Sequence, residues 1–250
     1  TSSGFSYADV NAFALTTPWN AKKVPESWLF DTMGGLPNSY FGTFYVPHHF
    51  AHMEYIVCFG ELRPGIVIVI DGSGSFEQDR GLFNIHEKKH PKVIQKIFPA
   101  GKEVISAYRF DGKSSQLIYR FSPSLSQNET SNHSSNGSLQ SIGHYWRWVS
   151  QYCCGSVNEA GKVMGLAAFG TQPSVDEPNI LSLDSEGFIR VDYHELATQF
   201  TNPNICNDDL TNNRHYENLA ARVQHETENV ILRLVALLKK KFPEDVLYLT

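Results

Sequence analysis

Residues 63–75 read RPGIVIVIDGSGS, and this stretch decides the fold class. At its centre, residues 66–70 are β-branched and apolar at every position, so the run shows no alternation between an apolar and a polar face. A strand with this composition is typical of the middle of a sheet, where both faces are covered. The turn residues on either side end it sharply. We therefore predict a buried central strand that stops at Asp71.

The segment before this strand is typical of an α-helix rich in histidine. Pro47 suits the first helical turn, and residues 48–59 contain no helix breaker before Gly60. A helix over these residues places His48 and His52 four positions apart, so that both imidazoles lie on one side.

Two imidazoles at this spacing indicate a candidate metal site that needs a third ligand. A carboxylate is the natural choice, and Asp71 stands where the buried strand ends, a position at which open α/β sheets present functional groups. The alternative is that His48 and His52 cap the helix or form hydrogen bonds in the core.

Residues 86–90 read HEKKH, which satisfies the H-E-x-x-H pattern of zinc proteases. Pro91 disfavours helical dihedrals at His90, and no third ligand follows at the spacing these proteases use. We therefore predict a polar turn here and reject a protease site.

Residues 159–165 combine a carboxylate, a lysine and two glycines. Gly161 and Gly165 would let a backbone approach a ligand, Lys162 suits a phosphate, and Glu159 is able to accept a hydrogen bond from a hydroxyl group. The spacing is not that of a Walker loop. An ordinary turn is the alternative.

Further elements follow from periodicity and turn residues. Residues 104–110 and 116–121 flank Asp111-Gly112, a dipeptide favoured in two-residue hairpins, and predict an antiparallel ribbon. Residues 122–141 are rich in serine and asparagine, which predicts an exposed loop.

The last third of the chain carries the strongest helical pattern. Apolar residues recur at helical spacing over residues 216–241, and Pro243 ends the pattern. A shorter helix is predicted over residues 144–152 and a final strand over residues 246–250.

Composition and charge narrow the classes of function. With 41% apolar and 12% aromatic residues, a chain of 250 residues is able to bury a substantial core. The 21 basic and 26 acidic residues leave a net charge of −5, which argues against a nucleic-acid partner. No purely apolar stretch approaches the roughly 20 residues of a membrane-spanning helix. The four cysteines include an adjacent pair, which suits a reducing compartment, and we expect a cytoplasmic location.

Four segments, taken in order, resemble the NodU/CmcH-type O-carbamoyltransferase family. VPHHFAH at residues 46–52 is similar to its H-H-x-x-H signature, and residues 68–75 resemble its strand followed by Asp-Gly. GKVMGLAAFG at residues 161–170 is similar to its G-K-x-M-G-L-A-x-x-G run. Residues 218–228 resemble the helix before a glycine-rich turn of the family, and the resemblance extends from about residue 40 to Thr250.

The resemblance implies an α/β fold of the actin/sugar-kinase/Hsp70-like (ribonuclease H-like) type. Such a fold has a mixed sheet flanked by helices, here with a β-hairpin insertion, and two such halves enclose a nucleotide. On this basis residues 1–250 are part of an N-terminal, threonylcarbamoyl-synthase-like carbamoyltransferase domain. We expect the family's C-terminal domain to lie outside this sequence, and the family's opening strand has no counterpart in residues 1–40. We expect a fragment of a longer protein.

The resemblance also implies a reaction. A carbamoyl group would pass from carbamoyl phosphate, through an ATP-derived carbamoyl-adenylate, to a hydroxyl of a natural product or sugar. His48, His52 and Asp71 resemble three ligands of a divalent metal, expected to be iron, and Glu159 is the candidate catalytic base. The residues expected to bind cofactors are Gly72, Ser73, Lys162 and Gly165.

Two other functions stay open. One is a transferase similar to tRNA threonylcarbamoyl-adenosine synthases, and the other is a non-catalytic module that binds a nucleotide or a metal. For the transferase we expect a small hydroxylated acceptor as partner, and neither nucleic acid nor a membrane. The sequence does not decide the oligomeric state, and a homodimer is one alternative to a monomer.

Overall fold

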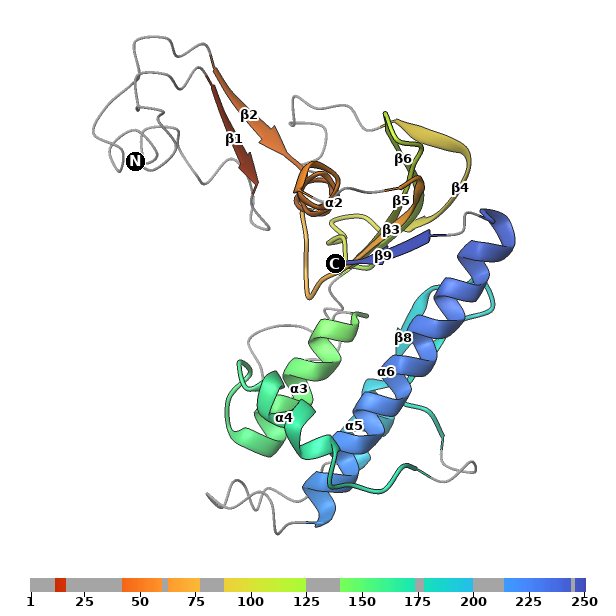
Figure 1. The fold of residues 1–250 in the computed structure, drawn as a ribbon. Helices are drawn as coiled ribbons and strands as arrows, with labels where there is room; N and C mark the ends of the chain where they lie inside the picture. Colours follow the sequence, from red (N-terminus) through yellow and green to blue (C-terminus); the bar gives the residue numbers. More distant parts are fainter. Residues whose placement is uncertain are drawn as a thin grey trace, which may run out of the picture. The chain divides into compact units, whose positions relative to one another are not determined.

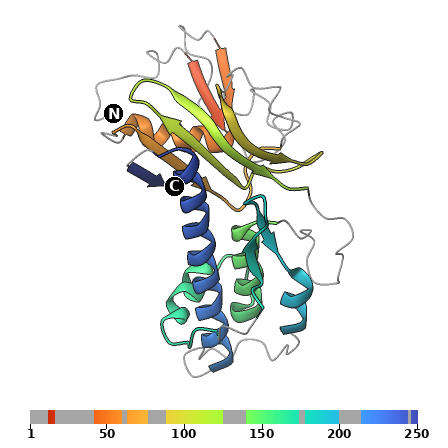
Figure 2. The same cartoon turned by 90° about the vertical axis from the view of Figure 1, so that its right-hand side faces the viewer.

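The computed structural model describes most of the chain and divides into two compact units (Figures 1 and 2). The described residues are 12–16, 42–59, 63–76, 88–124, 140–173, 178–199, 214–243 and 246–250. The first unit comprises Thr1–Val69, Ser73–Ser122 and Val246–Thr250. The second comprises Ile70–Gly72 and Pro123–Asp245.

Within the described residues, the first unit is built on a five-stranded sheet of order β4-β6-β5-β3-β9. Its strands are β3 (Gly65–Ile70), β4 (Lys89–Ile97), β5 (Ile105–Phe110), β6 (Ser115–Ser122) and β9 (Val246–Leu249). Strand β3 pairs in parallel with β9, and β4 pairs in parallel with β6. Strands β5 and β6 are antiparallel. The predicted α/β class with a mixed sheet is confirmed.

Strand β3 has the interior position that its all-apolar sequence predicts. It lies between β5 and β9, and the side chains of residues 66–69 are at most 1% exposed. Burial of a strand on both faces requires apolar side chains at consecutive positions, because no side chain points to water. The strand ends at Ile70, so Asp71 is the first residue after it.

Helix α2 (His48–Phe59) covers the residues predicted for it. The amide of Ala51 donates to the carbonyl of Pro47 at 2.9 Å, so the helix begins directly after the proline. One side of α2 packs on the sheet. The buried cluster there consists of Met53, Val67, Val69, Tyr108 and Leu117, joined by the partly buried Phe50, Ile56, Val57, Val93 and Tyr248.

The predicted hairpin is present, but it is not an insertion. Strands β5 and β6 are interior strands of the main sheet. Their loop has four residues, 111–114, because Phe110 pairs with Ser115. Gly112 has a φ of +95°, which glycine adopts without strain. The two-residue turn suggested by Asp111-Gly112 is therefore lengthened by two residues.

A second, smaller sheet in the described part of the first unit has two strands. Strands β1 (Ala12–Thr16) and β2 (Gly42–Val46) pair in parallel with each other. Strand β2 leads through Pro47 into helix α2, so the sheet and the histidine-bearing helix are consecutive in the chain.

The second unit is mainly helical. Its elements are α3 (Ile142–Cys154), α4 (Ala160–Ala167), β7 (Leu181–Leu183), β8 (Ile189–Val191), α5 (Tyr193–Gln199) and α6 (Arg214–Lys241). Figure 1 shows the long helix α6 alongside α3 and α4, which it contacts. The helices predicted over residues 144–152 and 216–241 and the strand predicted over residues 246–250 are confirmed.

Helix α3 has the end signals that its sequence supplies. Ser141 precedes it, and its hydroxyl accepts a hydrogen bond from the amide of His144. Gly155 ends it in the left-handed conformation with a φ of 70°. Residues 125–139 of the predicted exposed loop lie outside the described residues. Among the helices that the structure describes, none has the length and apolar character needed to span a membrane.

Candidate metal centre

Two imidazoles meet at the start of helix α2. The Nε2 atoms of His48 and His52 lie 3.2 Å apart, and the rings stand edge to face with their centroids 4.7 Å apart. Both side chains are half-buried. The helix therefore places the two imidazoles together, as the spacing of four residues predicts.

Asp71 completes a group of three. Asp71 directly follows Ile70, the last residue of strand β3. His48, His52 and Asp71 each offer a ligand atom, and these atoms all lie within 4.8 Å of one another. The structure brings together the three residues predicted as ligands, and their binding of a metal stays a prediction.

The chemistry of this group fits a divalent transition metal. Two imidazole nitrogens and one carboxylate form a donor set that iron and zinc accept, and three protein ligands leave positions for water or a substrate. A hydrogen bond between the two Nε2 atoms of His48 and His52 requires a proton on one of them. A cation bound there would displace that proton, so binding is expected to release it.

Glu54 is another carboxylate on helix α2, but it does not belong to this group of ligand atoms. Partial burial raises the pKa of Glu54 above its ordinary value, because the charged form loses hydration. The candidate third ligand is Asp71, because its ligand atom lies within the group that His48 and His52 form.

The loop after β3 contains two of the residues predicted to bind cofactors. The amide of Gly72 donates to Oδ1 of Asp71 at 2.5 Å, and its carbonyl accepts from the hydroxyl of Ser141 at 3.1 Å. A Cβ atom added at Gly72 would have nothing within 4 Å, so the space beside it is open. Ser73 follows and is half-buried. The cofactor roles of both residues stay predictions.

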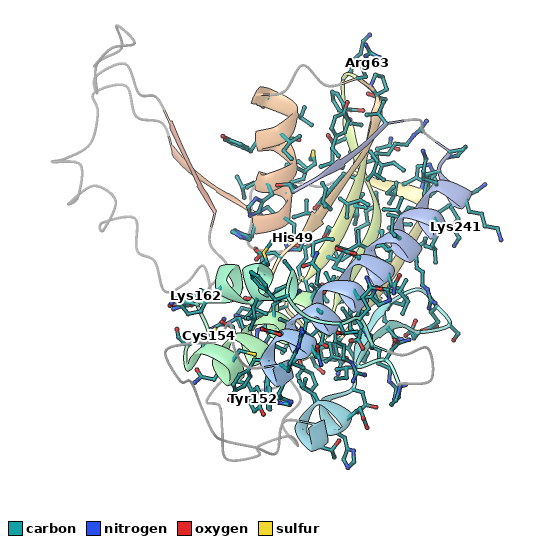
Figure 3. The ribbon with its side chains drawn as sticks, turned by 60° about the horizontal axis from the view of Figure 1, so that its bottom comes forward. His49, Arg63, Tyr152, Cys154, Lys162 and Lys241 are labelled. Carbon is teal, nitrogen blue, oxygen red and sulfur yellow. The ribbon has the colours of Figure 1, made fainter. Side chains whose placement is uncertain are left out.

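The remaining predicted residues lie in helix α4 of the second unit or directly before it. Glu159 precedes the helix, and its carboxylate pairs with Nζ of Lys162 at 3.0 Å. Lys162 is labelled in Figure 3. A Cβ atom added at Gly161 or Gly165 would have nothing within 4 Å. The segment is a helix, so the alternative of an ordinary turn is wrong.

The Glu159–Lys162 pair is accessible to a ligand. The side chain of Lys162 is 63% exposed and that of Glu159 is 34% exposed. Ion pairs this exposed contribute little to stability, so a ligand is able to separate them at low cost. The arrangement leaves Glu159 usable as a base and Lys162 as a partner for phosphate, and both roles stay predictions.

The HEKKH segment does not form a helix where the structure describes it. His86 and Glu87 lie outside the described residues, whereas Lys89 and His90 begin strand β4. Nδ1 of His90 accepts a hydrogen bond from the amide of Lys92 at 3.1 Å. The predicted polar turn is therefore wrong at its last two residues. A strand also lacks the helical stacking that the zinc-protease pattern needs, which supports its rejection.

Sequence reasoning missed a set of buried polar residues beside the candidate centre. His49, Glu103, Ser106 and Arg120 are each at most 1% exposed. Figure 3 shows His49 at the N-terminal end of helix α2. A signal was present for Arg120, which stands in the otherwise apolar and aromatic run of residues 117–121, where a charge is rare unless it is paired.

Comparisons with known proteins add no assignment. No protein-family model matches the chain. No curated protein matches it either. The candidate centre is therefore argued from its residues and their geometry.

Proposed function

We propose that the protein is a metal-dependent O-carbamoyltransferase that uses carbamoyl phosphate and ATP. The acceptor is a hydroxyl group of a natural product or sugar. The observation that carries the proposal is the meeting of His48, His52 and Asp71, whose ligand atoms lie within 4.8 Å of one another. These residues come from two of the four segments that resemble the NodU/CmcH-type family.

The topology of the first unit supports the finer fold assignment. Strand β3 has β9 as a parallel neighbour, and on its other side stands β5, which is antiparallel to β6. The chain reaches β9 from the long helix α6. An antiparallel pair beside a central strand, with a parallel strand reached through a helix, suits the actin/sugar-kinase/Hsp70-like architecture.

The three residues at the candidate centre would hold the metal, expected to be iron. A bound divalent cation supplies a Lewis acid that offsets negative charge developing on a carbamoyl oxygen. To bind it, His48 and His52 present unprotonated Nε2 atoms, and Asp71 presents an anionic carboxylate. Protonation of either imidazole would expel the cation.

Glu159 serves as the base in the transfer step. The acceptor oxygen attacks the carbamoyl carbon of the adenylate, and its proton passes to the carboxylate of Glu159. The bond from that carbon to the phosphate oxygen breaks, and the nucleotide leaves with the electron pair. Lys162 provides positive charge for phosphate oxygens, while Gly72 and Gly165 leave room for a ligand.

The first experiment measures iron content and carbamoyl phosphate-dependent formation of the adenylate from ATP. Loss of a residue that only hydrogen-bonds to a metal ligand lowers metal affinity by up to about a hundredfold. We therefore expect His48→Ala and His52→Ala, which each remove a ligand, to lower metal affinity by at least about a hundredfold and to abolish formation of the adenylate. His90→Ala is the matched control, because His90 lies in strand β4, and it should retain both properties.

The outcomes separate the proposal from its alternatives. Equal losses in all three variants would overturn the assignment of the centre. A wild-type protein that binds iron but forms no adenylate would contradict the transferase and favour a non-catalytic binding module.

A further inference from the structure

A chain of hydrogen bonds runs through the interior of the first unit from an arginine to a histidine. Nε of Arg120 donates to Oε1 of Glu103 at 2.9 Å, and the hydroxyl of Ser106 donates to the same oxygen at 2.5 Å. Nδ1 of His49 lies 3.1 Å from that hydroxyl. Its four members come from strand β6, the segment before β5, strand β5 and helix α2.

The direction of these bonds fixes the protonation pattern. A serine hydroxyl has one proton, and Ser106 gives it to Glu103. Towards His49 the hydroxyl therefore accepts, so Nδ1 of His49 carries a proton. The positive charge of Arg120 already balances the carboxylate of Glu103 at 2.9 Å. Nδ1 of His49 also lies 3.8 Å from Oε2 of Glu103, so the imidazole faces both the hydroxyl and the carboxylate.

This series of hydrogen bonds is not a catalytic triad, although it contains a serine, a histidine and a glutamate. Ser106, His49 and Glu103 are each 0% exposed, so no substrate reaches the hydroxyl. In a triad the serine gives its proton to the histidine, whereas here Ser106 gives it to the carboxylate. These hydrogen bonds therefore hold the four side chains in fixed positions relative to one another.

The chain holds the loop that follows Asp71 against the helix that carries His48. A Cβ atom added at Gly74 would lie 2.7 Å and 2.8 Å from Cδ2 and Nε2 of His49, so the loop backbone rests on the edge of that ring. The amide of Gly74 donates to the carbonyl of Glu103 at 2.6 Å.

The first residue of helix α2 is attached to the same loop. The hydroxyl of Ser75 accepts from the amide of His48 at 3.0 Å, which satisfies a donor that the helix itself leaves open. The carbonyl of Ser75 accepts from the amide of Glu103 at 3.0 Å. The loop, the helix start and the sheet are thus joined at one place.

We propose that His49 is a positioning residue that sets the distance between the imidazoles of His48 and His52 and the carboxylate of Asp71. This inference rests on the proposed metal site. Apolar residues often replace a buried ion pair without loss of stability, so a contribution to stability alone does not explain why these four polar side chains are buried together. Directional hydrogen bonds fix the orientation of the His49 ring in a way that apolar packing does not.

The test uses Co²⁺, whose visible absorption reports both affinity and coordination geometry. His49→Leu removes the donor to Ser106, and we expect Co²⁺ affinity to fall about tenfold to a hundredfold with a changed spectrum. His49→Asn places an amide N–H where Nδ1 stands, and it should restore most of the affinity and the original spectrum. Ile118→Val is the control, because Ile118 is buried in β6 outside the chain.

Each outcome decides the inference. Unchanged Co²⁺ binding in His49→Leu would overturn the positioning role alone, and absence of Co²⁺ binding by the wild type would overturn the metal site together with it. Equal loss of affinity in Ile118→Val would show a general effect of stability and would also overturn it. If His49→Leu does not fold, Ser106→Ala breaks the chain at its middle and is expected to give the same loss.

Discussion

Two buried arginine–glutamate pairs, one in each unit, have nearly the same geometry and different surroundings. Nε of Arg120 lies 2.9 Å from Glu103 in the first unit, and Nε of Arg222 lies 3.0 Å from Glu226 in the second. Both carboxylates are almost completely buried. The difference between the pairs lies in the groups that the carboxylates contact besides the arginine.

Glu226 is surrounded by donors that hold its own unit together. Oε2 accepts from the hydroxyl of Tyr145 at 2.9 Å and from the amide of Leu181 at 3.0 Å. Oε1 accepts from the amide of Ile180 and from Arg222, both at 3.0 Å. These bonds attach the start of strand β7 to helices α3 and α6, so the pair stabilises the fold of the second unit.

Glu103, by contrast, connects to the candidate metal centre. Its hydrogen bonds continue through Ser106 to His49, the neighbour of His48 in helix α2. Burial of a charge alone therefore does not identify a functional site in this protein. The informative feature is where the hydrogen bonds of each carboxylate lead. Those of Glu226 lead to the backbone at the start of β7 and to Tyr145, whereas those of Glu103 lead to the helix that carries the candidate ligands His48 and His52.

The largest expected effects come from neutralising the two carboxylates in turn. Glu103→Gln and Glu226→Gln should each lower the free energy of unfolding by about 3–5 kcal/mol, because each leaves a buried guanidinium without its compensating charge. Only Glu103→Gln should also weaken Co²⁺ binding. Urea denaturation and Co²⁺ titration of both variants measure the two effects. Equal weakening of Co²⁺ binding by Glu226→Gln would remove the distinction between the pairs.

The sequence predicts the backbone of the first unit better than its polar interior. Helix α2 and strand β3 follow from local signals, namely Pro47 before an uninterrupted segment and a run of β-branched residues ended by glycines. His48, His52 and Asp71 could be placed together for the same reason, since each stands at a position that these two elements define.

The Ser106–Arg120 contact across the hairpin could not be predicted. A two-residue turn at Asp111-Gly112 would pair Ser106 with Leu117, whereas the observed register pairs it with Arg120. The four-residue loop and an irregularity after Ala107 shift the register. Because side chains alternate between faces, such a shift decides which residues meet in the interior. Helix α4 was hidden for another reason, since its two glycines weaken the helical signal.

A smaller effect is expected from loss of the hydrogen bond that the hydroxyl of Tyr145 donates to Glu226. Tyr145→Phe should lower the free energy of unfolding by about 0.5–1.5 kcal/mol near neutral pH, because one hydrogen bond to a buried carboxylate is lost. Burial first, and then the negative charge of Glu226, raise the pKa of Tyr145 well above its ordinary value. The folded protein therefore keeps this proton after the unfolded chain has lost it.

The sign of the pH dependence follows from that difference. With a raised pKa in the folded state, the contribution of Tyr145 is complete below about pH 10 and declines as the pH rises further, by up to about 1.4 kcal/mol per unit. The stability advantage of the wild type over Tyr145→Phe should thus shrink between pH 9 and pH 11 in urea denaturation. An advantage that grows over this range would contradict the assigned contact between the two side chains.

The smallest expected effect comes from an exposed carboxylate, Asp111, in the hairpin loop. Its Oδ1 accepts from the amide of Ser114 at 2.8 Å and from the amide of Lys113 at 2.9 Å, and these bonds lower the pKa of Asp111 below its ordinary value. A lowered pKa makes the contribution complete above the ordinary aspartate pKa and removes it as the pH falls through the folded value. Asp111→Ala should lower the melting temperature slightly at pH 7 and less at pH 2.

Asp111→Asn separates charge from hydrogen bonding in this loop. The amide oxygen of Asn still accepts from the two backbone amides, so the variant should lie between the wild type and Asp111→Ala and show no dependence on this titration. Melting temperatures of all three proteins between pH 2 and pH 7 test the order. A loss as large as that of Glu103→Gln would mean that an exposed loop carboxylate matters as much as a buried one, and the contrast between exposed and buried charge would fail.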